Sequence, residues 1–506
     1  MQFREKVLNQ TLWETTQENM DQLSSELSAI LIEPAKQVGL CKRVQLSKPK
    51  PRLNPLKPWF DEACERNRRI FFKAKDKIWT AKTPFELDKC SDEIRQKGKE
   101  YKTFISNRQK IFNKNLHKNL RDLKKRNPRE YWQILKKSES SAKKEPKVSI
   151  GAFERHFTEL SSGNSENNSA TDFDPRKIGH ATNQEINVDF TFEEVYRSVK
   201  NLKNDKSEGI DLIKNEYLKS CPLEVIQLAV ILFNLVLRTG IVPTEWSIGL
   251  IVPIFKKKGS QHDPNNYRGI TLLSCLGKLF TLCICVRLNL YATRRGLIGE
   301  EQAAFRENYN TYDHIFVLNE LINLYLHDRD RLYGCFVDYK QAFDRILRVS
   351  LWRKLIASEI NGNIITVIFN MYKNAKSCVK QQMLISGFFA CNIGVRQGEN
   401  LSPFLFAIFL NDFELFLSRK YNGLTKINRL GDILGDDDVQ YFINMFILLY
   451  ADDTLILAET PEQLQLAMHA ASDYCIQWDL HINQSKTKVV IFSMGKSYHK
   501  LSFKIW

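Results

Sequence analysis

The sequence predicts a mixed α/β (α+β) protein preceded by basic α-helices, and three observations lead to this prediction. Residues 223–238 have apolar side chains at helical spacing, whereas residues 250–255, 332–338 and 445–452 are short apolar runs typical of strands. In residues 61–126, apolar side chains again recur at helical spacing, and many lysines and arginines occupy the positions between them. The chain has 506 residues, of which 43% are hydrophobic and 26% charged, enough for several domains with buried cores.

The basic region, residues 59–150, is predicted to bind RNA. Residues 1–150 contain 35 Lys and Arg against 19 Asp and Glu, and the remainder contains 39 of each, so the whole net charge of +16 lies in the first third. A solvated helix surface is the simpler alternative. Because the charge is so concentrated, we favour binding to a phosphate backbone.

Two polar stretches predict the domain boundaries. Residues 1–58 form an N-terminal segment that ends in a proline-rich linker at 47–58, because proline disfavours helix at the residue before it. Asn127 and Pro128 are predicted to begin a new helix within the basic region. Residues 161–177 are almost free of apolar side chains, which predicts a flexible linker over 151–185 and a folded domain over 186–506.

Other features exclude several classes of protein. The eleven cysteines include no CxxC pair, which disfavours both a disulfide framework and a structural zinc site. The N-terminal residues lack the apolar core of a secretory signal, and the longest apolar stretch, 225–237, is too short to span a bilayer. We therefore expect an intracellular protein, cytoplasmic or nuclear, that is not secreted and has no membrane partner.

Two acidic constellations can carry chemistry. Asp338 follows the apolar run 332–337, and a carboxylate at the end of a buried strand is held rigidly at a cleft, although capping the helix predicted over 342–360 is the simpler role. Asp452 and Asp453 lie between the two apolar halves of residues 445–458, which predicts a β-hairpin with both acids at its tip. Adjacent carboxylates are costly without a cation. With Asp338 they can hold two divalent ions for phosphoryl transfer.

Five motifs in order resemble one family. Residues 450–453 (YADD) are similar to the YxDD box of reverse transcriptases, and residues 336–344 resemble their first catalytic motif, FxDxxxAFD. Residues 394–398 (GVRQG) and 401–403 (LSP) resemble the motif between them, while 250–259 with 265–280 resembles the fingers hairpin. Trp478 with residues 480–492 resembles the motif after the catalytic hairpin. Over about residues 190–495 the order resembles the non-LTR (LINE-type, arthropod jockey-like) retrotransposon reverse transcriptases.

This resemblance implies a right-hand polymerase with fingers and palm over residues 186–506. It implies an RNA-directed DNA polymerase that adds dNTPs to a primer 3′-hydroxyl, with an RNA template and a DNA primer or target as partners. Asp338, Asp452 and Asp453 would be catalytic and would bind two Mg²⁺ ions, or Mn²⁺ in their place.

The resemblance also implies roles for residues of the nucleotide site. Lys256 or Lys257, with Arg268, would clamp the triphosphate. Phe343, five residues after Asp338, stands at the sugar-gate position, where its ring would exclude a ribose 2′-hydroxyl. The simpler alternatives are an exposed turn for the lysines and a core aromatic for Phe343.

Four further residues complete the implied site. Gln397 and Gly398 would line the nucleotide and template pocket. Lys486 or Lys488 would act as a general acid toward the pyrophosphate.

The sequence departs from the family pattern in several places. Gly269 replaces a proline, which we expect to loosen a turn, and Glu399 with Asn400 replaces Cys-Pro, which we expect to place a carboxylate near template or nucleotide. The acidic run 436–438 is expected to be a solvated loop.

The chain ends at Trp506, where the thumb is expected to begin, so we expect the thumb to be missing or incomplete. The upstream endonuclease and downstream knuckle of such elements do not occur in the sequence, which is expected to be a truncated piece of a larger element protein. A decayed, non-catalytic nucleic-acid-binding remnant is the main alternative. A two-metal nuclease gives no role to Gln397, Gly398 or the 256–268 hairpin.

Overall fold

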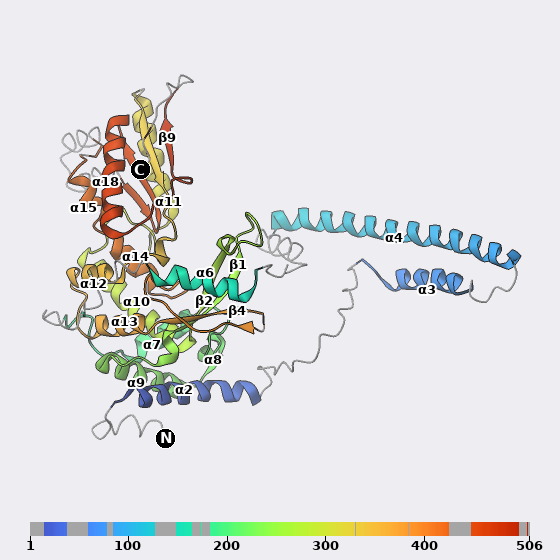
Figure 1. Ribbon diagram of the computed structural model, residues 1–506, viewed down its shortest axis with the longest axis horizontal. Helices are drawn as coiled ribbons and strands as arrows, with labels where there is room; N and C mark the ends of the chain where they lie inside the picture. The colour runs from blue at the N-terminus through green and yellow to red at the C-terminus, as the bar shows by residue number, and fades with distance from the viewer. Residues whose placement is uncertain are drawn as a thin grey trace. The chain divides into compact units, whose positions relative to one another are not determined.

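A computed structural model describes residues 15–37, 59–77, 84–126, 148–163, 174, 183–328, 330–382, 384–421, 423–424, 447–494 and 503. The chain divides into two compact units, one comprising Met1–Cys41 with Pro146–Trp506 and the other Lys42–Glu145 (Figure 1). The expected linker at 47–58, the helix start at Asn127 and the acidic run 436–438 lie outside the described residues. The mixture of helices and strands expected from the sequence is confirmed.

The unit Lys42–Glu145 contains a pair of helices, α3 (Glu62–Asp76) and the long α4 (Pro84–Arg126). Asp61 caps α3, because its side chain accepts a hydrogen bond from the backbone nitrogen of Cys64. Phe71 of α3 stacks on Tyr101 of α4, with ring centroids 5.8 Å apart. An ion pair of 2.7 Å between Lys77 and Glu93 joins the same helices. Tyr101 of the predicted basic region thus lies on the surface on which the two helices pair, whereas Ile111 further along α4 is 52% exposed.

The first sheet of the larger unit, here called the β1 sheet, contains β1 (Ile248–Phe255), β2 (Tyr267–Leu272), β4 (Lys376–Gln381), β5 (Leu384–Ile385) and β6 (Phe389–Ala390). Its order is β2-β1-β4-β5, and β6 also pairs with β4. β1 is antiparallel to β2 and parallel to β4. Helix α6 (Ile150–Ser162) packs Phe153 and Phe157 against this sheet, where they form a small core with Tyr267.

The second sheet, here called the β3 sheet, has the order β7-β8-β3-β9 and is antiparallel throughout. Its strands are β7 (Ile447–Tyr450), β8 (Asp453–Ala458), β3 (Leu332–Val337) and β9 (Lys488–Phe492). Helices α11 (Thr311–His327) and α18 (Pro461–Trp478) pack against it, in the yellow-to-red part of Figure 1. β3 and β7 therefore come from two of the apolar runs that predicted strands.

The remaining helices of this unit build its main core. They are α2 (Gln17–Gln37), α7 (Phe192–Asn201), α8 (Asn215–Ser220), α9 (Leu223–Thr239), α10 (Cys275–Arg295), α12 (Arg348–Ala357), α13 (Asn363–Lys373), α14 (Ser402–Leu410) and α15 (Phe413–Ser418). The described chain also contains 3₁₀ turns: η5 (Thr244–Ser247) before β1, η6 (Pro264–Asn266) between β1 and β2, and η7 (Ala342–Asp344) after β3. The helix expected over 342–360 is therefore divided, with η7 at its start and α12 beginning only at Arg348.

The structure differs from the expected domain boundaries at two helices. Helix α2 belongs to the larger unit rather than to a separate N-terminal segment, because Leu23, Leu27 and Leu31 join the main core. Helix α6 occupies the start of the linker expected over 151–185, because its two phenylalanines cover the β1 sheet. In both helices the buried side chains recur at helical spacing.

By length and composition alone, helix α10 is long and apolar enough to cross a membrane. However, 67% of its apolar 18-residue stretch is buried inside the protein. It is longer than the 225–237 stretch from which the sequence expectation was drawn. The ten cysteines of the described chain carry free thiols. Burial raises the pKa of five of them to about 12, those of Cys275, Cys283, Cys285, Cys335 and Cys475.

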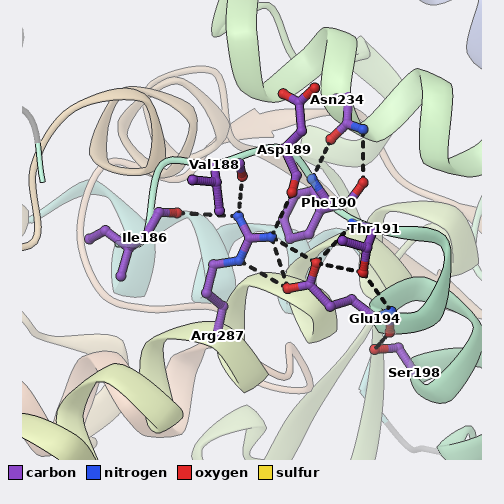
Figure 2. Close-up of polar contacts among 9 residues, drawn as sticks. All are labelled: Ile186, Val188, Asp189, Phe190, Thr191, Glu194, Ser198, Asn234 and Arg287. Atoms are coloured by element: carbon purple, nitrogen blue, oxygen red, sulfur yellow. Dashed lines mark hydrogen bonds and ion pairs between the residues drawn. The ribbon is translucent and has the colours of Figure 1, made fainter. Parts of the chain in front are cut away.

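The side chain of Arg287, on α10, holds the segment before α7 in place (Figure 2). It pairs with the Glu194 carboxylate at 2.8 Å and lies over the Phe190 ring, 4.1 Å from its centroid. Glu194 in turn accepts a hydrogen bond from the backbone nitrogen of Thr191, which completes a capping box at the start of α7. The Arg287 guanidinium also donates to three backbone carbonyl oxygens, those of Ile186, Val188 and Asp189.

Replacing Arg287 with Met should lower the free energy of unfolding by about 3 kcal/mol, because three carbonyl groups and a carboxylate lose a buried partner. The Arg287 side chain is only 7% exposed. A matched control is Arg238→Met, which removes an ion pair to Asp189 from a side chain 59% exposed and should cost less than about 1 kcal/mol. Urea denaturation of both variants measures the difference, and equal losses would contradict this role for Arg287.

Candidate active site

The register between β3 and β8 brings three carboxylates to one edge of the β3 sheet, the one formed by the ends of β3 and β7 and the start of β8. Val337 pairs with Thr454, which places Asp338, just after β3, opposite Asp453. Tyr450 pairs with Asp453 across the β7–β8 hairpin, so Asp452 lies in the turn between them. The predicted hairpin with adjacent acids at its tip is confirmed. Residues more than a hundred positions apart in the sequence thus meet at this edge.

Like charges oppose one another at this edge. Burial, followed by the carboxylates of Asp453 and Asp338, raises the pKa of Asp452 above its ordinary value. Arg268 of the β1–β2 hairpin acts in the opposite direction. The edge is therefore a place where a bound cation would relieve electrostatic repulsion.

The Asp338 carboxylate already has cationic and polar partners from the segment before β9. Lys486 Nζ lies 3.1 Å from its Oδ2, and Asn483 Nδ2 donates to the same oxygen at 2.9 Å. Within the described part of the chain, no group of three or more Asp, Glu, His or Cys side chains is arranged to hold a metal ion. The donor set consists of carboxylate oxygens, which suits hard divalent cations such as Mg²⁺. Asp338 would have to exchange Lys486 for the ion.

Basic side chains of the β1 sheet approach the same region. Partial burial, followed by the charges of Arg268 and Lys486, lowers the pKa of Lys256, and the Asp344 carboxylate raises it. Lys256 Nζ also donates to the carbonyl oxygen of Asn265 at 2.8 Å. Lys256, Arg268 and Lys486 are therefore close enough to influence one another.

Two of the candidate lysines lie apart from this group. Lys257 is exposed and has a φ of 59° in the turn after β1. Lys488 lies in β9 opposite Phe336, and its Nζ donates to the carbonyl oxygen of Ser485 at 3.0 Å. Of the lysine pair 486 and 488, it is Lys486 that contacts Asp338.

Gln397 has an aspartate partner that the sequence did not single out. Its Nε2 donates to both carboxylate oxygens of Asp344, each at 2.8 Å. Burial raises the pKa of Asp344 to about 6, against the lowering effects of Gln397, Lys256 and Arg268. The available signal was the second aspartate of the 336–344 motif.

Gly398 and Phe343 pack closely against neighbouring elements. Gly398 has a φ of 95°, and a Cβ added there would lie 2.8 Å from the carbonyl oxygen of Thr271 in β2, so only glycine fits. Phe343 is half-buried and stacks on Phe406 of α14, with ring centroids 4.4 Å apart and planes 18° from parallel. The backbone nitrogen of Val395 donates to the carbonyl oxygen of Phe343 at 2.8 Å, which joins the first motif to the 394–398 loop.

Two expectations about departures from the family pattern are wrong. Gly269 does not loosen a turn: it lies inside β2, where an added Cβ would be 2.7 Å from the Phe157 ring of α6. Glu399 does not reach toward a ligand: it is 5% exposed and accepts a hydrogen bond from the Tyr372 hydroxyl at 2.7 Å. In each case packing from an element distant in sequence decides the role of the residue.

The raised pKa of Asp344 makes stability depend on pH. Below about pH 4 the carboxyl is neutral in both the folded and the unfolded chain. Between about pH 4 and 6 the unfolded chain releases this proton first, so the folded state loses up to about 3 kcal/mol of stability as pH rises. Asp344→Asn lacks this loss, so its stability relative to the parent should increase from pH 4 to pH 7. Thermal unfolding at both values measures the shift, and an unchanged difference would contradict it.

Comparison with known proteins assigns the family of this half of the chain. Residues 255–505 match the family described as reverse transcriptase (RNA-dependent DNA polymerase). A probable RNA-directed DNA polymerase from transposon BS of Drosophila melanogaster is 28% identical over 298 residues, which are 58% of this chain and 31% of that protein. The RNA-directed DNA polymerase from mobile element jockey of Drosophila funebris is 27% identical over 309 residues, 60% of this chain and 32% of that protein.

The chain therefore spans about a third of the length of the curated relatives it matches. A solved apo telomerase structure from Candida tropicalis, truncated from its C-terminal domain, has 16% identity and a TM-score of 0.33 over 50% of this chain and 51% of that chain, too low to support an argument. The family match and the curated relatives agree with the motifs in the sequence. Residues 255–505 are thus a reverse transcriptase domain of the kind found in non-LTR retrotransposons.

Proposed function

We propose that this chain copies an RNA template into DNA by adding deoxynucleotides to the 3′-hydroxyl of a DNA primer. The observation that carries the proposal is that Asp338, Asp452 and Asp453 share one edge with the basic side chains of Lys256 and Arg268 nearby. Carboxylates can bind the divalent cations that accompany a nucleoside triphosphate, and adjacent basic side chains can bind its phosphate groups.

The three aspartates would hold two divalent ions, Mg²⁺ or in its place Mn²⁺. When bound, such ions stabilise the negative charge that develops on the attacking and leaving oxygens. The raised pKa of Asp452 supports this assignment, because the repulsion behind it would be relieved by a cation. Lys486 would then be free to leave Asp338 and approach the pyrophosphate as a proton donor.

Basic and aromatic side chains would position the nucleotide. Arg268 and Lys256 would bind the triphosphate, the arginine through its planar fork. Phe343, whose ring is fixed by Phe406, would stand beside the sugar and exclude a 2′-hydroxyl. Gln397, oriented by Asp344, and Gly398 would line the nucleotide and template pocket.

Replacing Asp452 with Asn should reduce primer extension about 1,000-fold or more, because one negative ligand is lost where charge stabilisation lowers the barrier. Extension of oligo(dT) on poly(A) with dTTP and Mg²⁺ measures the rate. The matched control is Asp473→Asn, an exposed residue of α18 paired with Lys420, which should leave the rate unchanged.

The same assay distinguishes the main alternative. If the parent chain binds RNA but extends no primer, it acts as a non-catalytic remnant of an element, and the polymerase proposal is wrong. Equal extension by the parent and Asp452→Asn would show that the carboxylate assignment is wrong.

We propose further that the unit Lys42–Glu145 binds the template RNA. It contains 31 Lys and Arg against 13 Asp and Glu, so it is more positive than the whole chain. Lys99, Lys102, Lys110 and Lys114 are exposed along α4, whereas Tyr101 of this helix stacks on Phe71 of α3. A helix with this distribution can follow a phosphate backbone.

Replacing these four lysines with Gln should weaken RNA binding and flatten its salt dependence. Each lost phosphate contact lowers the log–log slope by about 0.7 for a single strand, so the slope should fall by up to about 3. Titration of a fluorescent RNA oligonucleotide at several salt concentrations measures it.

A control removes the same number of exposed charges from the larger unit. It carries the substitution to Gln at Lys200, Lys203, Lys206 and Lys373. An equal fall in slope for both variants would mean that the RNA responds only to total charge and that α4 is not its binding surface.

A further inference from the structure

The segment between α10 and α11 runs along the free edge of the β7–β8 hairpin, whose turn contains Asp452. β7 is the edge strand of the β3 sheet, and its Leu449 exchanges backbone hydrogen bonds with this segment. Leu449 donates to the carbonyl oxygen of Glu301 at 2.7 Å, and Ala303 donates to the carbonyl oxygen of Leu449 at 3.1 Å. The segment therefore acts as a short parallel extension of the sheet, with Gln302 opposite Leu449.

Gln302 contacts the turn that carries Asp452. Its side chain is 2% exposed, and its Oε1 accepts a hydrogen bond from the backbone nitrogen of Ala451 at 3.1 Å. The same oxygen accepts from the backbone nitrogen of Ala304, also at 3.1 Å. Because two donors face this position, the amide oxygen and not the amide nitrogen must lie there.

Ala451 needs this support. It has a φ of 59°, a left-handed conformation that an alanine adopts at a cost of about 1–2 kcal/mol. Ala451 is buried, so water does not readily replace the side-chain oxygen. Without Gln302, the turn would lose its hydrogen-bond acceptor and could relax to an unstrained conformation that moves Asp452.

Gln302 itself is not explained by stability. Its Nε2 is buried and has no hydrogen-bond partner in the described part of the chain. An unsatisfied buried donor costs about 1–3 kcal/mol, which an apolar side chain would avoid. The hydrogen bond that its Oε1 accepts from the backbone nitrogen of Ala451 accounts for a glutamine at this position.

The segment that carries Gln302 is itself anchored. Asn411, just after α14, accepts from the backbone nitrogen of Gly299 at 3.1 Å and donates to the carbonyl oxygen of Leu297 at 2.6 Å. Arg306 donates to the carbonyl oxygen of Gly299 at 2.9 Å and to the Glu300 carboxylate at 3.0 Å. A rigid support of this kind can fix a functional group to within a fraction of an ångström.

We infer that Gln302 is a positioning residue for nucleotide addition, which fixes the strained Ala451 turn and so the place of Asp452. The inference rests on the proposed polymerase function. Gln302 contacts the backbone of the Ala451 turn, whereas the cationic residues proposed to bind the triphosphate come from the β1–β2 hairpin. We therefore expect Gln302 to affect the chemical step rather than substrate binding.

Steady-state primer extension by the full chain tests the inference. Gln302→Met keeps the size of the side chain and removes the acceptor, so kcat should fall about 10- to 100-fold while KM for dTTP stays within about twofold. The matched control is Gln463→Met. Gln463 Oε1 also accepts a backbone hydrogen bond, from Glu459 at 3.3 Å, but at the opposite end of β8, so kcat should not change.

A second measurement needs no activity. Hydrogen–deuterium exchange of the peptide covering residues 449–454 should become faster in Gln302→Met, because the Ala451 amide loses its acceptor, and should be unchanged in Gln463→Met. If the parent chain shows no extension but this difference appears, the positioning contact stands and the polymerase proposal fails. Unchanged exchange in Gln302→Met overturns the inference.

A rescue experiment separates positioning from general damage. Glycine adopts a positive φ without strain, so Ala451→Gly combined with Gln302→Met should recover part of the lost kcat, measured against Ala451→Gly alone. A fall in kcat that this substitution does not reverse, or an accompanying loss of folded protein in the thermal unfolding curve, would assign Gln302 a merely structural role and overturn the inference.

Discussion

The antiparallel register of β3 against β8 is the constraint on which the candidate site depends. Cys335 opposite Ile456 and Tyr333 opposite Ala458 fix it, because these side chains are buried in the main core. A slip of one residue would turn each apolar side chain of β3 to the opposite face. It would also separate Asp338 from Asp453. Burial of the sheet therefore also holds the carboxylates of Asp338 and Asp453 next to each other. The rest of the fold must offset the electrostatic repulsion between them.

The site joins groups of opposite charge that come from different sheets. Carboxylates are presented by the β3 sheet and basic side chains by the β1 sheet. The 394–398 loop contacts elements of both, because Gln397 donates to Asp344 after β3 and Gly398 packs against Thr271 of β2. Arg396 of this loop does not face the site. It donates to the carbonyl oxygens of Trp246, Ser247 and Met371, which secures the loop to the start of β1 and to α13. Charged residues here thus divide into those proposed to carry the chemistry and those, such as Arg396, that attach a loop.

The parts of the fold that could be predicted from sequence are those that local patterns determine. The apolar halves around Asp452 and Asp453 specify a hairpin by themselves, and the run ending at Asp338 specifies a strand. The placement of α6 and the burial of Glu399 could not be predicted, because each depends on a partner far along the chain. Gln302 was missed for the same reason. Nothing in its local sequence indicates that its oxygen meets Ala451, almost 150 residues later.

The buried thiols give this protein a set of internal labels that report on its opening. A thiol reacts with alkylating reagents as the thiolate, and five of the described cysteines have a pKa near 12, so the folded core is almost inert at pH 8. Cys64 and Cys90 lie in the other unit, on α3 and α4. The order in which mass spectrometry detects alkylation at these sites would therefore distinguish a chain whose two units open independently from one that opens as a whole.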